Sequence, residues 1–330
     1  VMSGRSFAYD LTIINDSNKR IQGIAFRDSG DLDIADCHVS ELCNLNRNEN
    51  VSVKSVITVK KRGYCLLDGI WILQEDPLGI MRKPRFYPIQ DKILVLPKLY
   101  SIPNIQFQVH RRFHQGGIPF AEKKGETEEF ISLREYRSGD PIKKINWKAS
   151  AKSGKTIVNE YQDEYHSRYG LVLDTYVDKA SRRQFEIAVS LSASIVFSSD
   201  LHESVLDLMF LGSVPYRIPI GSGLNSRQYA LSVIAGVQGQ PRENITELAQ
   251  LIKQHLFLMH SMILVLLRLD EERIDIIRSL VSNQIHLKIL LVAEKPEKEI
   301  ARINSLNLKA DITVISRKDP ERSIHRITDA

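Results

Sequence analysis

The sequence predicts a β-sandwich followed by an α/β domain whose mostly parallel sheet is covered on both faces. Residues 1–97 contain short apolar–polar alternations separated by turn residues, with no helical period. The second half alternates short apolar runs with segments whose apolar residues recur at helical spacing, which is typical of parallel sheets flanked by helices. At 330 residues the chain is long enough for two domains with separate cores.

The first domain contains four segments with the strand pattern. They are residues 7–13, 51–59, 64–73 and 92–96, the last closed by Pro97. The sequence Lys60-Lys61-Arg62-Gly63 separates the second and third segments, so we expect these two to pair as a hairpin. Asp76-Pro77-Leu78-Gly79 has the composition of a turn.

Residues 98–165 are expected to form a linker and an arm between the two domains. Periodicity fades after Lys98, and residues 128–162 look extended with one polar turn at 137–141. We therefore place the sandwich at 1–97 and the α/β domain at 166–330.

The α/β domain is predicted from its alternating elements. The expected strands are residues 169–173, 205–211, 216–220, 262–267, 285–292 and 312–315. The expected helices cover residues 185–196, 245–259, 274–281 and 300–306.

Composition places the chain among globular proteins, with 43% hydrophobic residues, 26% charged residues and a formal net charge of +5. The segment Leu133–Lys155 holds seven basic and two acidic residues, and this local excess of five positive charges equals the net charge of the whole chain. Three cysteines without a C-x-x-C pair argue against a disulfide framework and favour a reducing compartment. No run approaches the roughly 20 apolar residues of a spanning helix. Because the chain opens at Val1 directly before a strand, we expect it to be part of a longer protein.

The first strand of the α/β domain delivers Asp174 to its carboxyl end, where ligands gather in such sheets. Asp174 and Asp178 could ligate Mg²⁺ through oxygen. The alternative, which we favour, is that Asp174 caps its loop or the following helix. Ser153-Gly154-Lys155-Thr156 resembles a phosphate loop but lacks the required earlier glycine. No local catalytic motif is present, so we expect no enzyme activity.

The basic segment carries the most informative residues outside this strand end. Arg134, Tyr136, Arg137, Asp140, Lys144 and Trp147 are the candidate partner-binding residues. They favour an anionic protein partner, through arginine forks and an aromatic anchor. Nucleic-acid contact by the same basic residues is the alternative. A purely structural arm, in which Asp140 caps its own turn and Trp147 is buried, is the third interpretation.

These residues resemble the signature of the bacterial and archaeal "domain of unknown function fifty-eight" family. The family pattern R-x-Y-x-x-G-D-x-x-x-x-I-x-W-x-x-S-A, which we call the signature box, is matched here from Arg134 to Ala151. An upstream D-P-F/L-G element matches Asp76-Pro77-Leu78-Gly79, and a V-x-P strand end matches Val95 and Pro97.

The resemblance implies an immunoglobulin-like β-sandwich, the signature box and a von Willebrand A-like, doubly wound α/β domain. It also implies a parent protein anchored in the cell membrane, with this fragment on the cytoplasmic side. The expected partners are a MoxR-type AAA+ ATPase and a transglutaminase-like protein.

Von Willebrand A domains begin their metal site with D-x-S-x-S on the first strand–helix loop, and the matching positions here are Asp174, Tyr176 and Asp178. Both serines are missing, so we expect no cofactor and no tightly bound metal. A weak Mg²⁺ site at Asp174 and Asp178 is the minority alternative.

We therefore expect a non-enzymatic interaction scaffold or adaptor. Nucleic-acid binding through the basic arm is the alternative function, and a hydrolase that uses Asp174 and Asp178 is the third.

Overall fold

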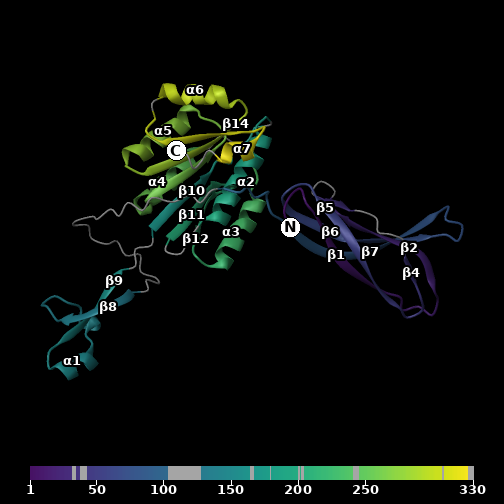
Figure 1. The fold of residues 1–330 in the computed structure, drawn as a ribbon, viewed down its shortest axis with the longest axis horizontal. Helices are drawn as coiled ribbons and strands as arrows, with labels where there is room; N and C mark the ends of the chain where they lie inside the picture. The colour runs from purple at the N-terminus through teal and green to yellow at the C-terminus, as the bar shows by residue number, and fades with distance from the viewer. Residues whose placement is uncertain are drawn as a thin grey trace. The chain divides into compact units, whose positions relative to one another are not determined.

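The computed structural model describes residues 1–31, 35–37, 43–102, 128–163, 167–178, 180–199, 201, 204–240, 245–306 and 308–325. The chain forms two compact units (Figure 1). The first unit joins Val1–Gln108 to Arg168–Ala330, and the second is Val109–Ser167. No helix within the described ranges has the length and apolar character needed to cross a membrane.

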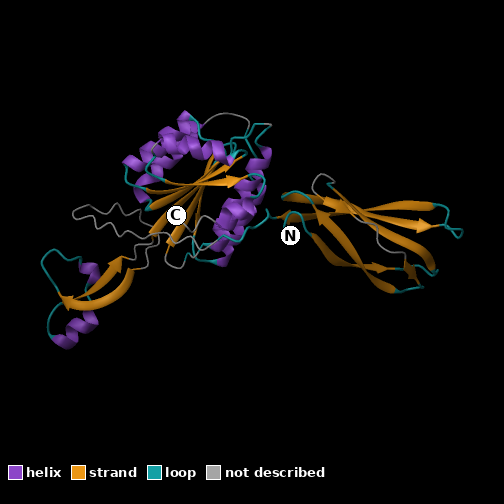
Figure 2. Cartoon of the chain, turned by 45° about the horizontal axis from the view of Figure 1, so that its top comes forward, coloured by secondary structure: helices purple, strands orange, loops and turns teal. Residues whose placement is uncertain are grey.

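The amino-terminal part of the first unit is a sandwich of two antiparallel sheets, with the strand orders β1-β5-β3 and β4-β2-β6-β7 (Figure 2). The strands are β1 (Ser6–Ile14), β2 (Ile21–Gly30), β3 (Ala35–Cys37), β4 (Cys43–Leu45), β5 (Asn50–Val59), β6 (Gly63–Glu75) and β7 (Arg82–Val95). Alternate residues of β1 and β5 point inward and meet the inward residues of β2 and β6 in the core. The expected sandwich is confirmed.

The predicted hairpin between residues 51–59 and 64–73 is wrong. β5 pairs with β1 and β3, whereas β6 pairs with β2 and β7, so the two runs lie in opposite sheets. Ile57 of β5 and Cys65 of β6 are buried in the same core cluster between the two sheets. Alternation reveals which face of a strand is buried but not which strand lies beside it.

The expected short strand at 92–96 is the end of the much longer strand β7. Pro84 pairs with Leu73 and Pro88 with Gly69 along the antiparallel β6–β7 hairpin. Because proline has no backbone N–H, prolines are tolerated in a strand at the sheet edge, and β7 is the edge strand of its sheet. The prolines obscured the strand pattern in the sequence.

The α/β domain is built on one six-stranded sheet in the order β12-β11-β10-β13-β14-β15. Its strands are β10 (Ser167–Leu173), β11 (Ser204–Leu211), β12 (Pro215–Ile220), β13 (Ser261–Leu266), β14 (His286–Ala293) and β15 (Asp311–Ser316). The pairs β10–β13, β13–β14 and β14–β15 are parallel, and β11–β12 is antiparallel. Read in chain order this is 3-2-1-4-5-6, a doubly wound sheet that reverses direction of winding between β10 and β13. The predicted fold class is confirmed.

Helices cover both faces of this sheet (Figures 1 and 2). They are α2 (Arg182–Ser198), α3 (Leu224–Gly236), α4 (Ile245–His255), the short 3₁₀ helix η2 (Leu256–Leu258), α5 (Glu271–Ser282), α6 (Pro296–Leu306) and α7 (Pro320–Ile324). One core cluster joins α2 and α3 to the sheet, and a second joins α4, α5 and α6 to the opposite face. Residues after β7 also enter the first cluster, since Ile102 is buried there and the Tyr100 N–H donates to Ser194 Oγ at 2.8 Å.

The second unit is not a purely extended arm, so that expectation is wrong. It contains β8 (Glu128–Glu135), the 3₁₀ helix η1 (Ile142–Lys144), α1 (Trp147–Ser153) and β9 (Ile157–Asp163), with β8 and β9 antiparallel. Asn146 caps α1 by accepting the Ala149 N–H at 3.0 Å. Gly154 ends the helix with φ of 68°, a left-handed conformation that glycine adopts without strain. These two capping residues were the helix signal in the sequence.

Candidate functional site

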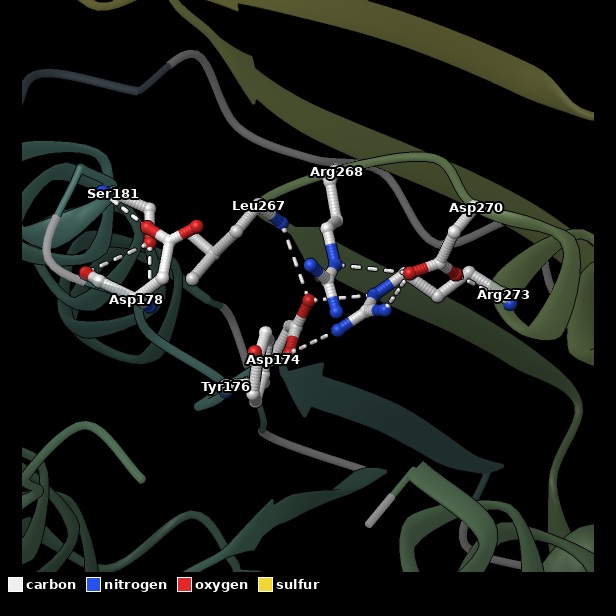
Figure 3. A network of polar contacts seen from close by, with 8 residues as sticks. All are labelled: Asp174, Tyr176, Asp178, Ser181, Leu267, Arg268, Asp270 and Arg273. Carbon is white, nitrogen blue, oxygen red and sulfur yellow. Dashed lines mark hydrogen bonds and ion pairs between the residues drawn. The ribbon is translucent and has the colours of Figure 1, made fainter. Parts of the chain in front are cut away.

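The carboxylate of Asp174, at the carboxyl end of β10, is held by a buried arginine (Figure 3). Arg273 Nε donates to Asp174 Oδ2 at 2.8 Å, and Arg273 Nη2 donates to Oδ1 at 3.0 Å. The Tyr176 N–H also donates to Oδ1, at 3.1 Å, and the Leu267 N–H to Oδ2 at 3.4 Å. Both carboxylate oxygens therefore already have donors from the protein itself.

Arg273 lies in the first turn of α5, and both it and Asp174 are only 1% exposed. Asp270, the N-cap of α5, accepts the Arg273 N–H at 3.0 Å and pairs with Arg273 Nη1 as well. Burial disfavours the guanidinium charge, but the hydrogen bonds and charges of Asp174 and Asp270 outweigh it and raise the pKa of Arg273. The cation that neutralises Asp174 is thus built into the chain.

A second arginine, Arg268, extends this network from Asp270 to the partly exposed Tyr176. Arg268 Nε lies 2.9 Å from Asp270 Oδ2, and the Arg268 guanidinium lies 4.2 Å from the centroid of the Tyr176 ring. A cation over an aromatic face at this distance is attracted by the ring quadrupole. Tyr176 therefore packs against Arg268, at the position where the metal motif would carry its first serine.

Asp178 hydrogen-bonds with Ser181 in the turn that precedes α2. Its Oδ1 accepts the Ser181 N–H at 2.7 Å, and its own N–H donates to Ser181 Oγ at 3.0 Å. These hydrogen bonds, led by Ser181, lower the pKa of Asp178. The capping interpretation offered for Asp174 is right for its loop, through the Tyr176 N–H. Asp178 orders the turn that precedes α2, whose N-cap Ser181 makes no side-chain capping hydrogen bond.

A cavity of about 360 Å³ lies at the carboxyl ends of the strands beside this network. It is lined by Tyr176, Asp178, Ala180, Ser181, Gln184, Leu267, Arg268, Leu291, Ala293, Glu294, Lys295, Lys298 and Glu299. Asp174 does not line it. The cavity lies where the winding of the sheet reverses, which is the usual ligand position in this fold. Any ligand there would meet Arg268 and Tyr176 but not the Asp174 carboxylate.

Within the described part of the chain, no three His, Cys, Asp or Glu side chains are grouped as a metal-ligand set. The donors that surround Asp174 also fit a metal poorly, because its oxygens already face a guanidinium and two backbone N–H groups. The residues present here suit an ion pair rather than octahedral oxygen coordination of a divalent cation.

In the second unit, the signature box is organised by another arginine–aspartate fork. Arg134 Nη1 and Nη2 donate to the two oxygens of Asp140 at 2.7 and 2.8 Å, and the Arg137 N–H donates to Asp140 Oδ2 at 2.8 Å. These donors lower the pKa of Asp140 to about 2, with the Arg134 hydrogen bonds as the largest cause. Arg134 and Asp140 thus fix the turn, as the structural interpretation proposed for Asp140.

Polar residues of the box also tie α1 to β9. Ser150 Oγ donates to the Asn146 carbonyl at 2.8 Å and accepts the Ile157 N–H at 2.8 Å. Asn146 Nδ2 donates to Asn159 Oδ1 at 2.9 Å. The box is consequently a small, internally bonded scaffold.

This scaffold displays large apolar side chains. Trp147 is 68% exposed and Ile142 is 71% exposed, so the expectation of a buried Trp147 in the structural interpretation is wrong. Tyr136 and Arg137 are also exposed, and Lys144 is half-buried at the end of η1. The predicted partner-binding residues therefore divide into Arg134 and Asp140, which build the turn, and the others, which lie at or near its surface.

The two predicted sites lie in different units. Sequence reasoning did not identify Arg273, Asp270 or Arg268. A signal was present, because Arg273 precedes Ile277 by one helical turn and so belongs to the apolar face of α5. A lone arginine on a buried helical face requires a buried anion.

Comparison with known proteins supports the expected family over part of the chain. Residues 132–265 match the family described as Protein of unknown function DUF58. The uncharacterized protein YeaD of Bacillus subtilis (strain 168) is 23% identical over 205 residues, which are 58% of this chain and 50% of that protein. The chain thus spans about half the length of the curated relative that it matches.

Among solved structures, the chain is similar to the manganese-loaded TRAP protein of Plasmodium vivax, with a TM-score of 0.38 and 11% identity over 49% of this chain and 72% of that one. It is also similar to proximal thread matrix protein 1 from the mussel byssus, with a TM-score of 0.36 and 11% identity over 49% of this chain and 44% of that one.

Replacing Arg273 by methionine is expected to cost about 3–5 kcal/mol of unfolding free energy, because Asp174 is left charged and buried without its partner. The double variant Asp174→Asn/Arg273→Met should be clearly more stable than the sum of the single variants predicts. Urea unfolding measures both effects. Arg278→Met on the same helix, where the Asp275 pair is exposed, is the control and should change stability by less than about 0.5 kcal/mol. Additive losses at 174 and 273 would contradict the ion pair.

The Asp140 carboxyl should titrate near pH 2 in the folded protein, below its ordinary value of about 3.9. Since the folded pKa is depressed, the Arg134–Asp140 fork stabilises the turn above the unfolded pKa, and this contribution is lost as pH falls through the folded pKa. Carbon-detected NMR titration of the Asp140 carboxyl measures the value directly. Arg134→Gln should move it upward, and an unchanged value in that variant would remove Arg134 as the cause.

Proposed function

This chain carries a DUF58 domain in residues 132–265, and on that premise we propose that it is a non-enzymatic protein-interaction scaffold. Its strand-end site is organised by a built-in arginine in place of a divalent cation. The observation that carries the proposal is the two-pronged contact of Arg273 with both oxygens of Asp174. The α/β domain then presents a fixed surface to a partner, with no metal as a bridge.

Electrostatics favours this arrangement over a metal-dependent one. A divalent cation at Asp174 would have to displace Arg273 or lie beside a positive charge in a site that excludes water. Either choice is costly because Arg273 is buried and is held by Asp174 and Asp270 on both sides of its guanidinium. A hydrolase based on Asp174 and Asp178 is also disfavoured, since the first carboxylate is ion-paired and the second accepts the Ser181 N–H in the turn before α2.

The surface of the signature box, in the other unit, is a second proposed docking site, and it is the one assigned to the partner ATPase. Trp147 and Ile142 project from short helices whose ends are fixed by hydrogen bonds, so a partner would pay little to order them. Exposed tryptophan is the side chain most often found at the energetic centre of interfaces. Exposed basic residues nearby in the sequence, Arg137, Lys143 and Lys148, favour a partner with an acidic surface.

The family resemblance supplies the candidate partners. We propose a MoxR-type AAA+ ATPase as the protein that docks on the box, and a transglutaminase-like protein as a further member of the assembly. We also propose that the parent protein is held at the cell membrane with this fragment on its cytoplasmic side.

Trp147→Ala should weaken binding of the partner ATPase by about tenfold or more, because truncation of an anchoring tryptophan commonly costs more than 2 kcal/mol. Arg137→Ala should weaken it less and mainly slow association. Phe257→Ala is the matched control, since Phe257 is an exposed aromatic residue of the other unit and its loss should leave binding unchanged. Binding is measured by surface plasmon resonance after circular dichroism has verified folding. Equal affinities for wild type, Trp147→Ala and Arg137→Ala would remove the box from the interface.

Nucleic-acid binding is the second candidate, and the basic excess of Leu133–Lys155 is the observation that favours it. Counterion release makes such binding strongest at low salt. A gel shift that is absent at low ionic strength rules it out. A shift that weakens steeply with salt, and that Trp147→Ala reduces, would favour it over the scaffold.

A further inference from the structure

The β6–β7 hairpin ends in a tip that exposes three large apolar side chains. Leu78, Ile80 and Met81 are 78%, 77% and 71% exposed. No other turn in the described ranges combines three large apolar side chains that are this exposed. The tip contains the Asp76-Pro77-Leu78-Gly79 element that the sequence singled out and that the proposed function does not use. Three adjacent apolar side chains on a turn are costly in water and indicate that something covers them.

The backbone of this tip is already hydrogen-bonded within itself. Asp76 Oδ1 accepts the N–H groups of Ile80 and Met81 at 2.7 and 3.0 Å, and its carbonyl accepts that of Gly79 at 2.9 Å. The Asp76 N–H donates to the Met81 carbonyl at 2.9 Å, and Pro77 has no N–H to satisfy. The tip can therefore leave water with few unsatisfied backbone donors, which is the condition for entering a lipid phase.

A basic collar follows the tip directly. Arg82, Lys83 and Arg85 are exposed at the start of β7. Arg82 pairs with Glu75 at 3.2 Å, whereas no carboxylate within the described ranges forms an ion pair with Lys83 or Arg85. Beyond the collar, Trp71 and Phe86 form an exposed aromatic pair with ring centroids 4.9 Å apart.

We propose that the β6–β7 hairpin inserts its tip into the surface of an anionic lipid bilayer. The order along the hairpin matches the depth profile of a membrane interface: apolar side chains for the acyl boundary, cations for lipid phosphates and aromatic rings for the interfacial belt. Strand addition by a protein partner is disfavoured, because Pro84 and Pro88 remove two N–H groups from the edge strand β7.

The test is co-sedimentation of the whole chain with vesicles of phosphatidylcholine, alone or mixed with phosphatidylglycerol. Wild type should bind the mixed vesicles at low ionic strength and bind less at high ionic strength. The double variant Leu78→Glu/Ile80→Glu should lower partitioning by about tenfold or more, since both apolar anchors are lost. Lys83→Ala/Arg85→Ala should reduce the preference for phosphatidylglycerol.

The matched control is Leu224→Glu/Phe257→Glu, which adds the same two charges at equally exposed apolar positions on other elements and should bind like wild type. This control separates insertion of the tip from general repulsion by added negative charge. Absence of binding to the mixed vesicles at low ionic strength would overturn the proposal and assign the tip to a protein partner. Equal loss in the tip variant and the control variant would overturn it too.

Discussion

The ion pair between Asp174 and Arg273 is the interaction on which the α/β domain's strand-end site depends. It joins the end of β10 to the first turn of α5, and through Asp270 and Arg268 it extends to Tyr176 at the edge of the cavity. Both charges are almost fully excluded from water, so each is tolerable only because the other is present. The loop that would present metal ligands in a von Willebrand A domain is therefore fixed here by a side chain of the chain itself.

The same chemical pair recurs in the signature box with a different consequence. Arg134 also donates two hydrogen bonds to the two carboxylate oxygens of Asp140. Because both side chains are partly exposed to water, this pair orders a turn, whereas the buried pair fixes a strand end to a helix. Ser150 and Asn146 complete the support of α1 from within. In both units the polar residues of the motif hold the backbone, and an aromatic residue lies beside them: Tyr176 lines the cavity, and Trp147 is exposed.

The sequence was sufficient for the features that depend on local periodicity. Apolar spacing located the strands and most helices of the α/β domain, and the box residues predicted the family that residues 132–265 match. What it missed depends on contacts between distant segments. Asp174 and Arg273 are 99 residues apart, and β5 and β6 follow one another in the chain while pairing in separate sheets. Alternation cannot distinguish a hairpin from a crossing between sheets, and a buried arginine is recognised only when its carboxylate is known.

The central claim is that Arg273 occupies the charge position that a divalent cation would otherwise need at Asp174. Calorimetric titration of Mn²⁺ into the folded chain addresses it most directly, because binding to a carboxylate site produces heat without requiring a partner or an activity. The account predicts no saturable binding to the wild-type protein at millimolar concentrations. A stoichiometric binding isotherm that Asp174→Asn abolishes would contradict it.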